Sequence, residues 1–319
     1  MDCTNKKSLL RVVYGDYTLG VHGQDVHYIF SYATGGLESL VKNGMEWLYR
    51  TPKPTFWRAL TDNDRGSRFH ISSGRWLAAD MFIQCKEISV YVDGKNLGHP
   101  CAPANNVYSS EEYAKEVSIT FTYETIVPPV NTVDVTYTVQ ETGTLRVLVH
   151  YHGVDGLPQL PVFGIRLIMP TKADRYRYEG LSGETYPDRM AGAIKGVWEE
   201  ESIAPTPYIV PQDCGMHMET EWVEIYRHRS LDNTQKMREA QMLKVCAADS
   251  KFAFSCLPYT ACELENATHQ EELPPARRTV LCIYGSVRGV GGIDSWGSDV
   301  ESKYQIEATK DIVFSFDVE

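Results

Sequence analysis

Hydrophobic and polar side chains alternate with a period of two over several stretches of this chain. Between residues 117 and 124, valine, isoleucine, phenylalanine and tyrosine at the odd positions are separated by serine, threonine and glutamate. The same alternation occurs over residues 88–92, 133–139, 145–149 and 312–318. Successive side chains of a β-strand point to opposite faces, so each stretch predicts a strand with one buried face.

Turn signals separate these stretches. Asp93-Gly94 follows the stretch at 88–92, and Glu141-Thr142-Gly143 joins the stretches at 133–139 and 145–149. Helical signals are few: Thr260 to Glu263 has capping-box spacing before a polar stretch that ends at Thr268, and residues 235–243 could form a second short helix. The pattern predicts an all-β fold, an antiparallel sandwich with few short helices.

Length and composition favour one large domain. The chain has 319 residues, of which 43% are hydrophobic, which is typical of a folded globular protein. The strand pattern continues across the middle, without a low-complexity linker or an internal repeat. We therefore expect a single domain rather than two.

The charge balance excludes several kinds of partner. With 31 basic and 42 acidic residues the net charge is −11, and no basic cluster reverses it locally. Such a surface repels nucleic acid and anionic membranes, whereas neutral ligands such as sugars are compatible with it. Eight cysteines lack Cys-x-x-Cys spacing, and no apolar run has the length of a signal peptide or a membrane span. These features predict a cytoplasmic protein with reduced thiols.

The most unusual local sequence is the run from Gly289 to Trp296. Glycines at positions 289, 291 and 292 permit positive φ and close approach of another surface, and a tryptophan follows them. An indole held out on a loop commonly stacks on a sugar or anchors an interface. Two other distinctive segments accompany this run, at residues 56–64 (FWRALTDND) and 184–189 (ETYPDR).

These three segments, in this order, resemble the C-terminal domain of the β-galactosidases of glycoside hydrolase family 2, which also exists as a separate small subunit. Shorter pieces support the resemblance, including residues 28–30, 35–37, 207–211 and 267–270. It extends from about Tyr14 to the C-terminus. It implies an N-terminal extension over residues 1–13 and one domain over residues 14–319, a supersandwich related in fold to galactose mutarotase.

The resemblance also implies what the chain does. In that family the two catalytic glutamates, with magnesium and sodium, belong to a barrel domain that precedes the matched region, and hydrolysis retains the anomeric configuration. This chain has no βαβ alternation from which to build a barrel. We therefore expect it to be inactive alone, to contain no cofactor, and to complete the galactoside-binding active site of a larger catalytic chain.

The residue expected to touch the sugar is Trp296. The corresponding tryptophan of the family lies at the rim of the active site, and the match includes Asp294 and Ser295 as secondary contacts, whereas Ile293 replaces an acid. The alternative for Trp296 is a buried corner of the core. We expect the segment from Asp62 to Gly74 to be a loop near this site, with Asp62, Asn63, Asp64 and Gly66 closest to it.

No residue of the chain is assigned a catalytic role. A retaining glycosidase needs two carboxyl groups about 5–5.5 Å apart, and the sequence pairs none of its candidates. The candidates within the distinctive segments are Asp62, Asp64, Glu184, Asp188 and Asp294. Turn, cap and ion-pair roles are commoner for such residues, and we expect Asp188 and Arg189 to form an ion-paired corner.

Metal binding is also not expected. His150 and His152 would share one face of a strand at chelating spacing, but no third ligand stands near them in the sequence. Residues 62–66 begin like a calcium loop, yet they lack acids at the positions where such a loop requires them.

One other function stays open at this point. A free-standing mutarotase-like protein, either a carbohydrate-binding protein or an aldose epimerase, would need a histidine and a glutamate at the anomeric oxygens. His217 and Glu184 could be proposed for these roles, although no motif supports the pair.

Overall fold

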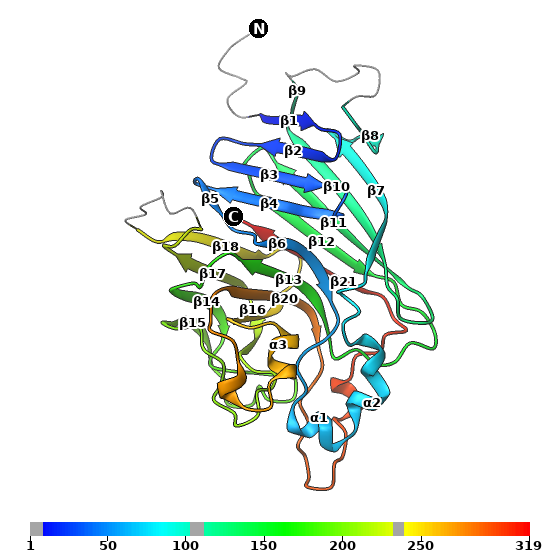
Figure 1. The fold of residues 1–319 in the computed structure, drawn as a ribbon, viewed down its shortest axis with the longest axis vertical. Helices are drawn as coiled ribbons and strands as arrows, with labels where there is room; N and C mark the ends of the chain where they lie inside the picture. The colour runs from blue at the N-terminus through cyan, green and yellow to red at the C-terminus, as the bar shows by residue number, and fades with distance from the viewer. Residues whose placement is uncertain (1–8, 103–111, 232–238) are drawn as a thin grey trace.

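The strands of the protein form three antiparallel sheets. The computed structural model describes residues 9–102, 112–231 and 239–319, and within them the sheets have six, ten and five strands. The ten-stranded sheet forms one layer, and the two smaller sheets lie beside each other against it (Figure 1). The prediction of an all-β antiparallel sandwich with few short helices is confirmed.

The six-stranded sheet contains the start of the described chain. In the order β5-β4-β3-β2-β1-β9, its strands are β5 (Met45–Glu46), β4 (Gly36–Lys42), β3 (Val26–Ser31), β2 (Thr18–His22), β1 (Leu10–Tyr14) and β9 (Glu112–Ala114). Residues 10–13 of the expected N-terminal extension thus belong to β1, where Leu10 and Val12 are buried. The domain boundaries themselves stay a prediction.

The ten-stranded sheet holds all the strands that the alternating pattern predicted. Its order is β15-β14-β17-β18-β21-β12-β11-β10-β7-β8. The bounds are β15 (Lys195–Glu200), β14 (Arg175–Leu181), β17 (Trp222–Arg227), β18 (Gln241–Ala247), β21 (Ile312–Val318), β12 (Leu145–Tyr151), β11 (Thr132–Gln140), β10 (Glu116–Glu124), β7 (Gln84–Val92) and β8 (Lys95–Gly98). In β10 and β11 every second residue is buried, as the period of two requires.

The five-stranded sheet has the order β16-β19-β20-β13-β6. Its strands are β16 (Met216–Thr220), β19 (Phe252–Leu257), β20 (Thr279–Val287), β13 (Val162–Met169) and β6 (Arg50–Thr55). All six residues of β19 are buried, so this strand lacks the alternation by which the sequence revealed the others.

Aromatic side chains join the layers into one core. Phe30 of the six-stranded sheet meets Tyr137 of the ten-stranded sheet with ring centroids 5.6 Å apart. Tyr178 and Phe254 make the corresponding contact to the five-stranded sheet at 5.3 Å. Large rings bury much apolar area, so these contacts hold both small sheets on a shared hydrophobic centre.

The helices of the described residues are short. They are α1 (Asp62–Gly66), α2 (Phe69–Ser73) and α3 (Ala261–Asn266), with 3-10 turns at Gly74–Trp76, Gln270–Glu272 and Ser302–Tyr304. The helix predicted after Thr260 is confirmed, because Thr260 caps α3 with the expected capping box. None of these helices is long and apolar enough to cross a membrane.

Two local predictions are wrong. The helix expected over residues 235–243 lies partly outside the described residues, and its last three residues begin β18, where pairing with β17 outweighs helix propensity. The segment from Asp62 to Gly74 is not a loop, because it folds into α1 and α2. The small residues of this segment suggested a loop, and the capping box between Thr61 and Asp64 that begins α1 was missed.

A candidate galactoside-contacting loop

The three distinctive sequence segments meet at one end of the molecule. There α1 lies beside the segment that follows β20, which forms the orange-red loop at the bottom of Figure 1. The amide Nδ2 of Asn63 donates to the carbonyl of Val290 at 3.0 Å, and Arg58 Nη2 donates to that of Gly289 at 3.2 Å. The segment at 56–64 therefore holds the backbone that leads to Trp296.

A buried ion network lies beneath this loop. Arg58 and Asp64, 1% and 2% exposed, form two hydrogen bonds, of 2.7 and 3.1 Å. Arg288 lies with Nη1 3.8 Å from Asp64 and is also paired with Asp299. Removal of one partner from such a pair leaves an uncompensated buried charge, which costs about 3–5 kcal/mol. Asp64, expected to be a loop residue near the site, is a buried structural anion.

Asp188 holds the loop backbone from the other side. Its carboxylate accepts hydrogen bonds from the amides of Val290 and Gly291, at 2.9 and 2.8 Å. The expected ion pair is present, with Arg189 Nη1 3.7 Å from Asp188 Oδ2, but this distance is longer than the hydrogen bonds from the two amides. Arg189 donates instead to the carbonyl of Gly291, so both residues of the predicted corner bind the loop.

The glycines of the loop are needed for its path. Gly291 and Gly292 have φ values of +68° and +76°, in the region that L side chains rarely adopt. A Cβ atom on Gly292 would stand 2.7 Å from Asn63 Nδ2. The glycine run thus lets the loop pass against α1 while it turns outward.

Trp296 stands in solvent at the end of this path. Its side chain is 92% exposed, so the alternative of a buried corner is excluded. Asp294 shapes the tip, because it accepts hydrogen bonds from the backbone amides of Trp296 at 2.9 Å and Ser298 at 3.2 Å. The hydroxyl of Ser298 and these amides lower the pKa of Asp294. Ser295 is exposed beside them, and contact of either residue with a sugar stays a prediction.

A cavity of about 420 Å³ opens beside the loop. Its walls come from α1, from residues 184–189, from residues 208–213 and from Val290. The exposed Asp62 and the residues Glu184 and Asp213 contribute carboxyl groups to this cavity.

Glu184 and Asp213 are already bound within the protein. Glu184 accepts hydrogen bonds from the Thr206 hydroxyl at 2.9 Å and from the Gly215 amide at 2.6 Å. Asp213 accepts one from the Tyr186 hydroxyl at 2.9 Å. Burial raises the pKa of Asp213 to about 7, against the opposing effects of Arg58 and Tyr186. Sequence reasoning missed Asp213, although it follows the recognised stretch 207–211 by two residues.

The geometry does not support the histidine–glutamate pair of a free-standing epimerase. His217 is 3% exposed and lies among Tyr176, Tyr178 and Phe254. Its two ring nitrogens are bound to the Tyr176 hydroxyl and the Gly183 carbonyl, each at 2.9 Å. Burial lowers the pKa of His217 to about 4, which fits a neutral core residue.

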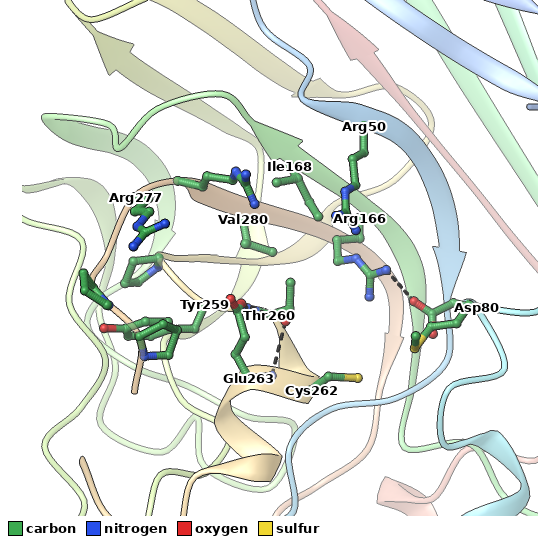
Figure 2. A pocket seen from close by; sticks show the side chains of 15 residues that line it. Arg50, Asp80, Arg166, Ile168, Tyr259, Thr260, Cys262, Glu263, Arg277 and Val280 are labelled. Carbon is green, nitrogen blue, oxygen red and sulfur yellow. Dashed lines mark hydrogen bonds and ion pairs between the residues drawn. The ribbon is translucent and has the colours of Figure 1, made fainter. Parts of the chain in front are cut away.

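A second cavity of about 420 Å³ lies on the five-stranded sheet next to α3 (Figure 2). Arg50, Arg166, Arg277 and Arg278 line it, together with the carboxylates of Asp80 and Glu263.

Both carboxylates of this cavity have structural roles. Asp80 pairs with Arg166 at 2.5 Å, as the dashed line in Figure 2 shows. Glu263 accepts the capping hydrogen bond from the Thr260 amide at 2.7 Å. The cavity therefore offers no free carboxyl pair for glycoside hydrolysis.

The strand register brings a third potential metal ligand to His150 and His152. Asp134 of β11 lies beside them, with its Oδ2 2.7 Å from His152 Nε2. The sequence separates Asp134 from the histidines by 16 and 18 residues, and only the strand register places them together.

Known proteins share most of this chain. A "Beta-galactosidase small subunit" of Latilactobacillus sakei is 60% identical over 99% of this chain and 98% of its own length. A "Beta-galactosidase" of Halalkalibacterium halodurans is 35% identical over 98% of this chain, which spans 28% of that protein. One of Streptococcus thermophilus is 30% identical over 99% of this chain and again 28% of its own length.

Solved structures resemble the chain more distantly. A galactose mutarotase-like protein from Lactobacillus casei matches 95% of this chain and 99% of its own, with 10% identity and a TM-score of 0.41. A putative aldose 1-epimerase from Escherichia coli matches 97% and 98%, with 10% identity and a TM-score of 0.42.

The family comparison agrees with the curated relatives. The family described as "Beta galactosidase small chain" matches residues 22–318, a range that includes all three segments converging on the loop. The chain belongs to the β-galactosidase small-chain family.

Proposed function

We propose that this chain binds a larger β-galactosidase chain and completes its active site, with Trp296 at the rim of the galactoside pocket. The observation that carries the proposal is the pairing of an almost fully exposed indole with a rigidly held backbone. Trp296 is 92% exposed, whereas the backbone at Gly289 and Val290 is bound by Arg58, Asn63 and Asp188.

An indole in this setting suits a sugar. The apolar C–H face of a galactose ring gains dispersion contact with the indole and displaces loosely held water. An exposed tryptophan gives no stability to its own fold, so a buried ion network that fixes its approach is explained by a role in binding. Terminal β-galactosides such as lactose are the substrates of the proposed complex.

The proposal divides the catalytic work between two chains. In the two cavities described above, the carboxyl groups of Asp80, Glu184, Asp213 and Glu263 are all bound within the protein, so neither cavity offers a free pair for the acid/base and the nucleophile. The proposal places these groups, a retaining mechanism, and the implied magnesium and sodium ions in the larger chain. Relatives of which this chain spans 28% have the length to hold such a part.

Exposed apolar side chains mark the surface proposed for the larger chain. They gather in α2 and in the segment after it: Ile71 is 70% exposed, Leu77 48%, Met81 64% and Phe82 58%. The guanidinium carbon of Arg288 lies 3.9 Å from the ring centroid of Phe69 in α2. This contact connects the exposed apolar surface to the base of the Trp296 loop. Apolar residues that stay exposed on a single chain are typical of a protein interface.

The compartment is part of the proposal. The seven cysteines among the described residues are all free, which fits a reducing compartment such as the cytoplasm.

Co-expression with a large β-galactosidase chain tests the proposal. We expect one complex on size exclusion, with hydrolysis of a nitrophenyl galactoside in the same fractions. The variant Trp296→Ala should form the complex and bind substrate more weakly. Separate elution of the two chains, with unchanged activity of the large chain, would show that the proposed function is wrong.

A further inference from the structure

Two histidines lie together on the outer face of the ten-stranded sheet. His150 and His152 are on the side of β12 that points away from the core, whereas Val149 and Tyr151 point into it. The imidazole centroids are 3.9 Å apart, and the side chains are 34% and 36% exposed. A cation in solution can reach both rings.

One carboxylate completes this cluster, and a second lies at its edge against His150. Asp134 lies directly opposite His150 in the register of β11 and β12, and its Oδ2 is 2.7 Å from His152 Nε2. Asp311, just before β21, has Oδ2 2.9 Å from His150 Nε2. Ligand atoms of Asp134, His150 and His152 all lie within 4.8 Å of one another.

Neighbouring groups hold both carboxylates in orientation. The hydroxyl of Thr122 on β10 donates to Asp134 Oδ1 at 2.5 Å, which leaves Oδ2 for the histidines. The amide of Gly153 donates to Asp311 Oδ1 at 2.9 Å, which leaves Oδ2 of Asp311 for His150. Hydrogen bonds of this kind orient the ligands of metal sites in proteins.

We propose that Asp134, His150 and His152 bind a divalent transition-metal cation of the zinc class, and that Asp311, which contacts only His150 of these three residues, moves in as the fourth ligand on binding. Imidazole nitrogens with carboxylate oxygens are the ligands that zinc accepts in tetrahedral sites, whereas magnesium and calcium prefer oxygen alone. Two carboxylates and two neutral imidazoles carry two negative charges, which a divalent cation balances. Coordination requires each Nε2 to be unprotonated, with the ring proton on Nδ1.

The bound cation would connect three strands of the sheet. Asp134 is on β11, the histidines are on or just after β12, and Asp311 begins the approach to β21. The unfolded chain lacks this arrangement, so binding stabilises the folded protein. The site uses none of the residues that hold the Trp296 loop, and the proposal is independent of the proposed function.

A second histidine pair supplies a matched control. His22 on β2 and His27 on β3 have their Nδ1 atoms 3.1 Å apart and are also accessible. In the described ranges they belong to no metal-ligand cluster, because no acid joins them. Substitution of His27 removes an exposed histidine pair without touching the proposed site.

The test measures zinc binding to the purified full chain by isothermal titration calorimetry, with thiols kept reduced, and thermal unfolding with and without ZnCl₂. We expect His152→Gln and Asp134→Asn each to weaken one zinc site by at least about tenfold and to abolish its stabilising shift in Tm. His27→Gln should bind zinc as the wild type does. Equal zinc binding by the wild type and His152→Gln would overturn the proposal, as would a site that His27→Gln removes.

Discussion

At the scale of single residues, Trp296 is distinguished by the contrast between its own exposure and the burial of the ion network of Arg58, Asp64 and Arg288 beneath its loop. We expect Trp296→Ala, measured in the reconstituted enzyme, to raise KM for lactose roughly ten- to thirty-fold, equivalent to about 1–2 kcal/mol, because the change removes contact but no catalytic group. Trp296→Phe should recover part of the loss by restoring an aromatic face.

A matched control is available for this prediction. Tyr17 is 71% exposed and lies between β1 and β2, two strands that stand at the opposite end of the molecule from the Trp296 loop in Figure 1. Tyr17→Ala should leave KM unchanged. A normal KM for Trp296→Ala would contradict the role in substrate binding, and failure of this variant to fold would contradict the exposed position.

Asp213 makes a prediction about pH. Its pKa is raised from 3.8 to about 7, so between these values the folded protein keeps a proton that the unfolded chain releases. Stability therefore falls as pH rises through this window and levels above it, with a slope of at most about 1.4 kcal/mol per pH unit. Asp213→Asn cannot titrate but can still accept from Tyr186.

Urea unfolding from pH 5 to pH 8 measures this effect. The free energy of unfolding of Asp213→Asn should rise relative to that of the wild type as pH increases to about 7. The difference between the two proteins isolates Asp213 from the other titrating groups. A difference that does not change with pH would show that the Asp213 carboxyl is ionised throughout.

At the scale of elements, α1 and α3 both begin with a capping box, but only α1 contacts the Trp296 loop. Thr61 and Thr260 each cap a helix in a capping box with an acid three residues later. Thr61→Ala and Thr260→Ala should each cost about 1 kcal/mol of stability in urea unfolding. Only Thr61→Ala should also raise KM for lactose in the reconstituted enzyme, because α1 carries Asn63 against Val290. Equal effects of the two variants on KM would show that α1 does not contribute to substrate binding through the Trp296 loop.

The sequence predicted the strands better than the site. Strands with one buried face, such as β10 and β11, can be predicted from the alternation of apolar and polar residues. By contrast, β19 is buried on both faces and has no such pattern. The family resemblance pointed to Trp296 and to the segments that converge on its loop, and contact of Trp296 with a sugar stays a prediction. It did not reveal that Asp64 and Asp188 hold the loop. Asp64 pairs with Arg58 six residues earlier, and the amides that bind Asp188 are more than 100 residues away and are brought close only by the fold.

At the scale of the whole molecule, the exposed apolar side chains of α2 and the following segment predict where the larger chain binds. Phe82→Asp should weaken the complex by at least about tenfold, because the change places a charge in an apolar contact. Tyr17→Asp, which introduces the same charge at the opposite end, should leave association unchanged. Equal affinities of the two variants, measured by biolayer interferometry with the large chain immobilised, would place the interface elsewhere.

In the proposed complex this chain completes an active site that it does not itself contain. Titration of a fixed amount of the large chain with this one, followed by hydrolysis of nitrophenyl galactoside, tests this proposal. We expect no hydrolysis by this chain alone and a rate that rises linearly to a sharp stoichiometric end point. Hydrolysis by this chain alone, or a large chain whose rate is unchanged throughout the titration, would contradict it.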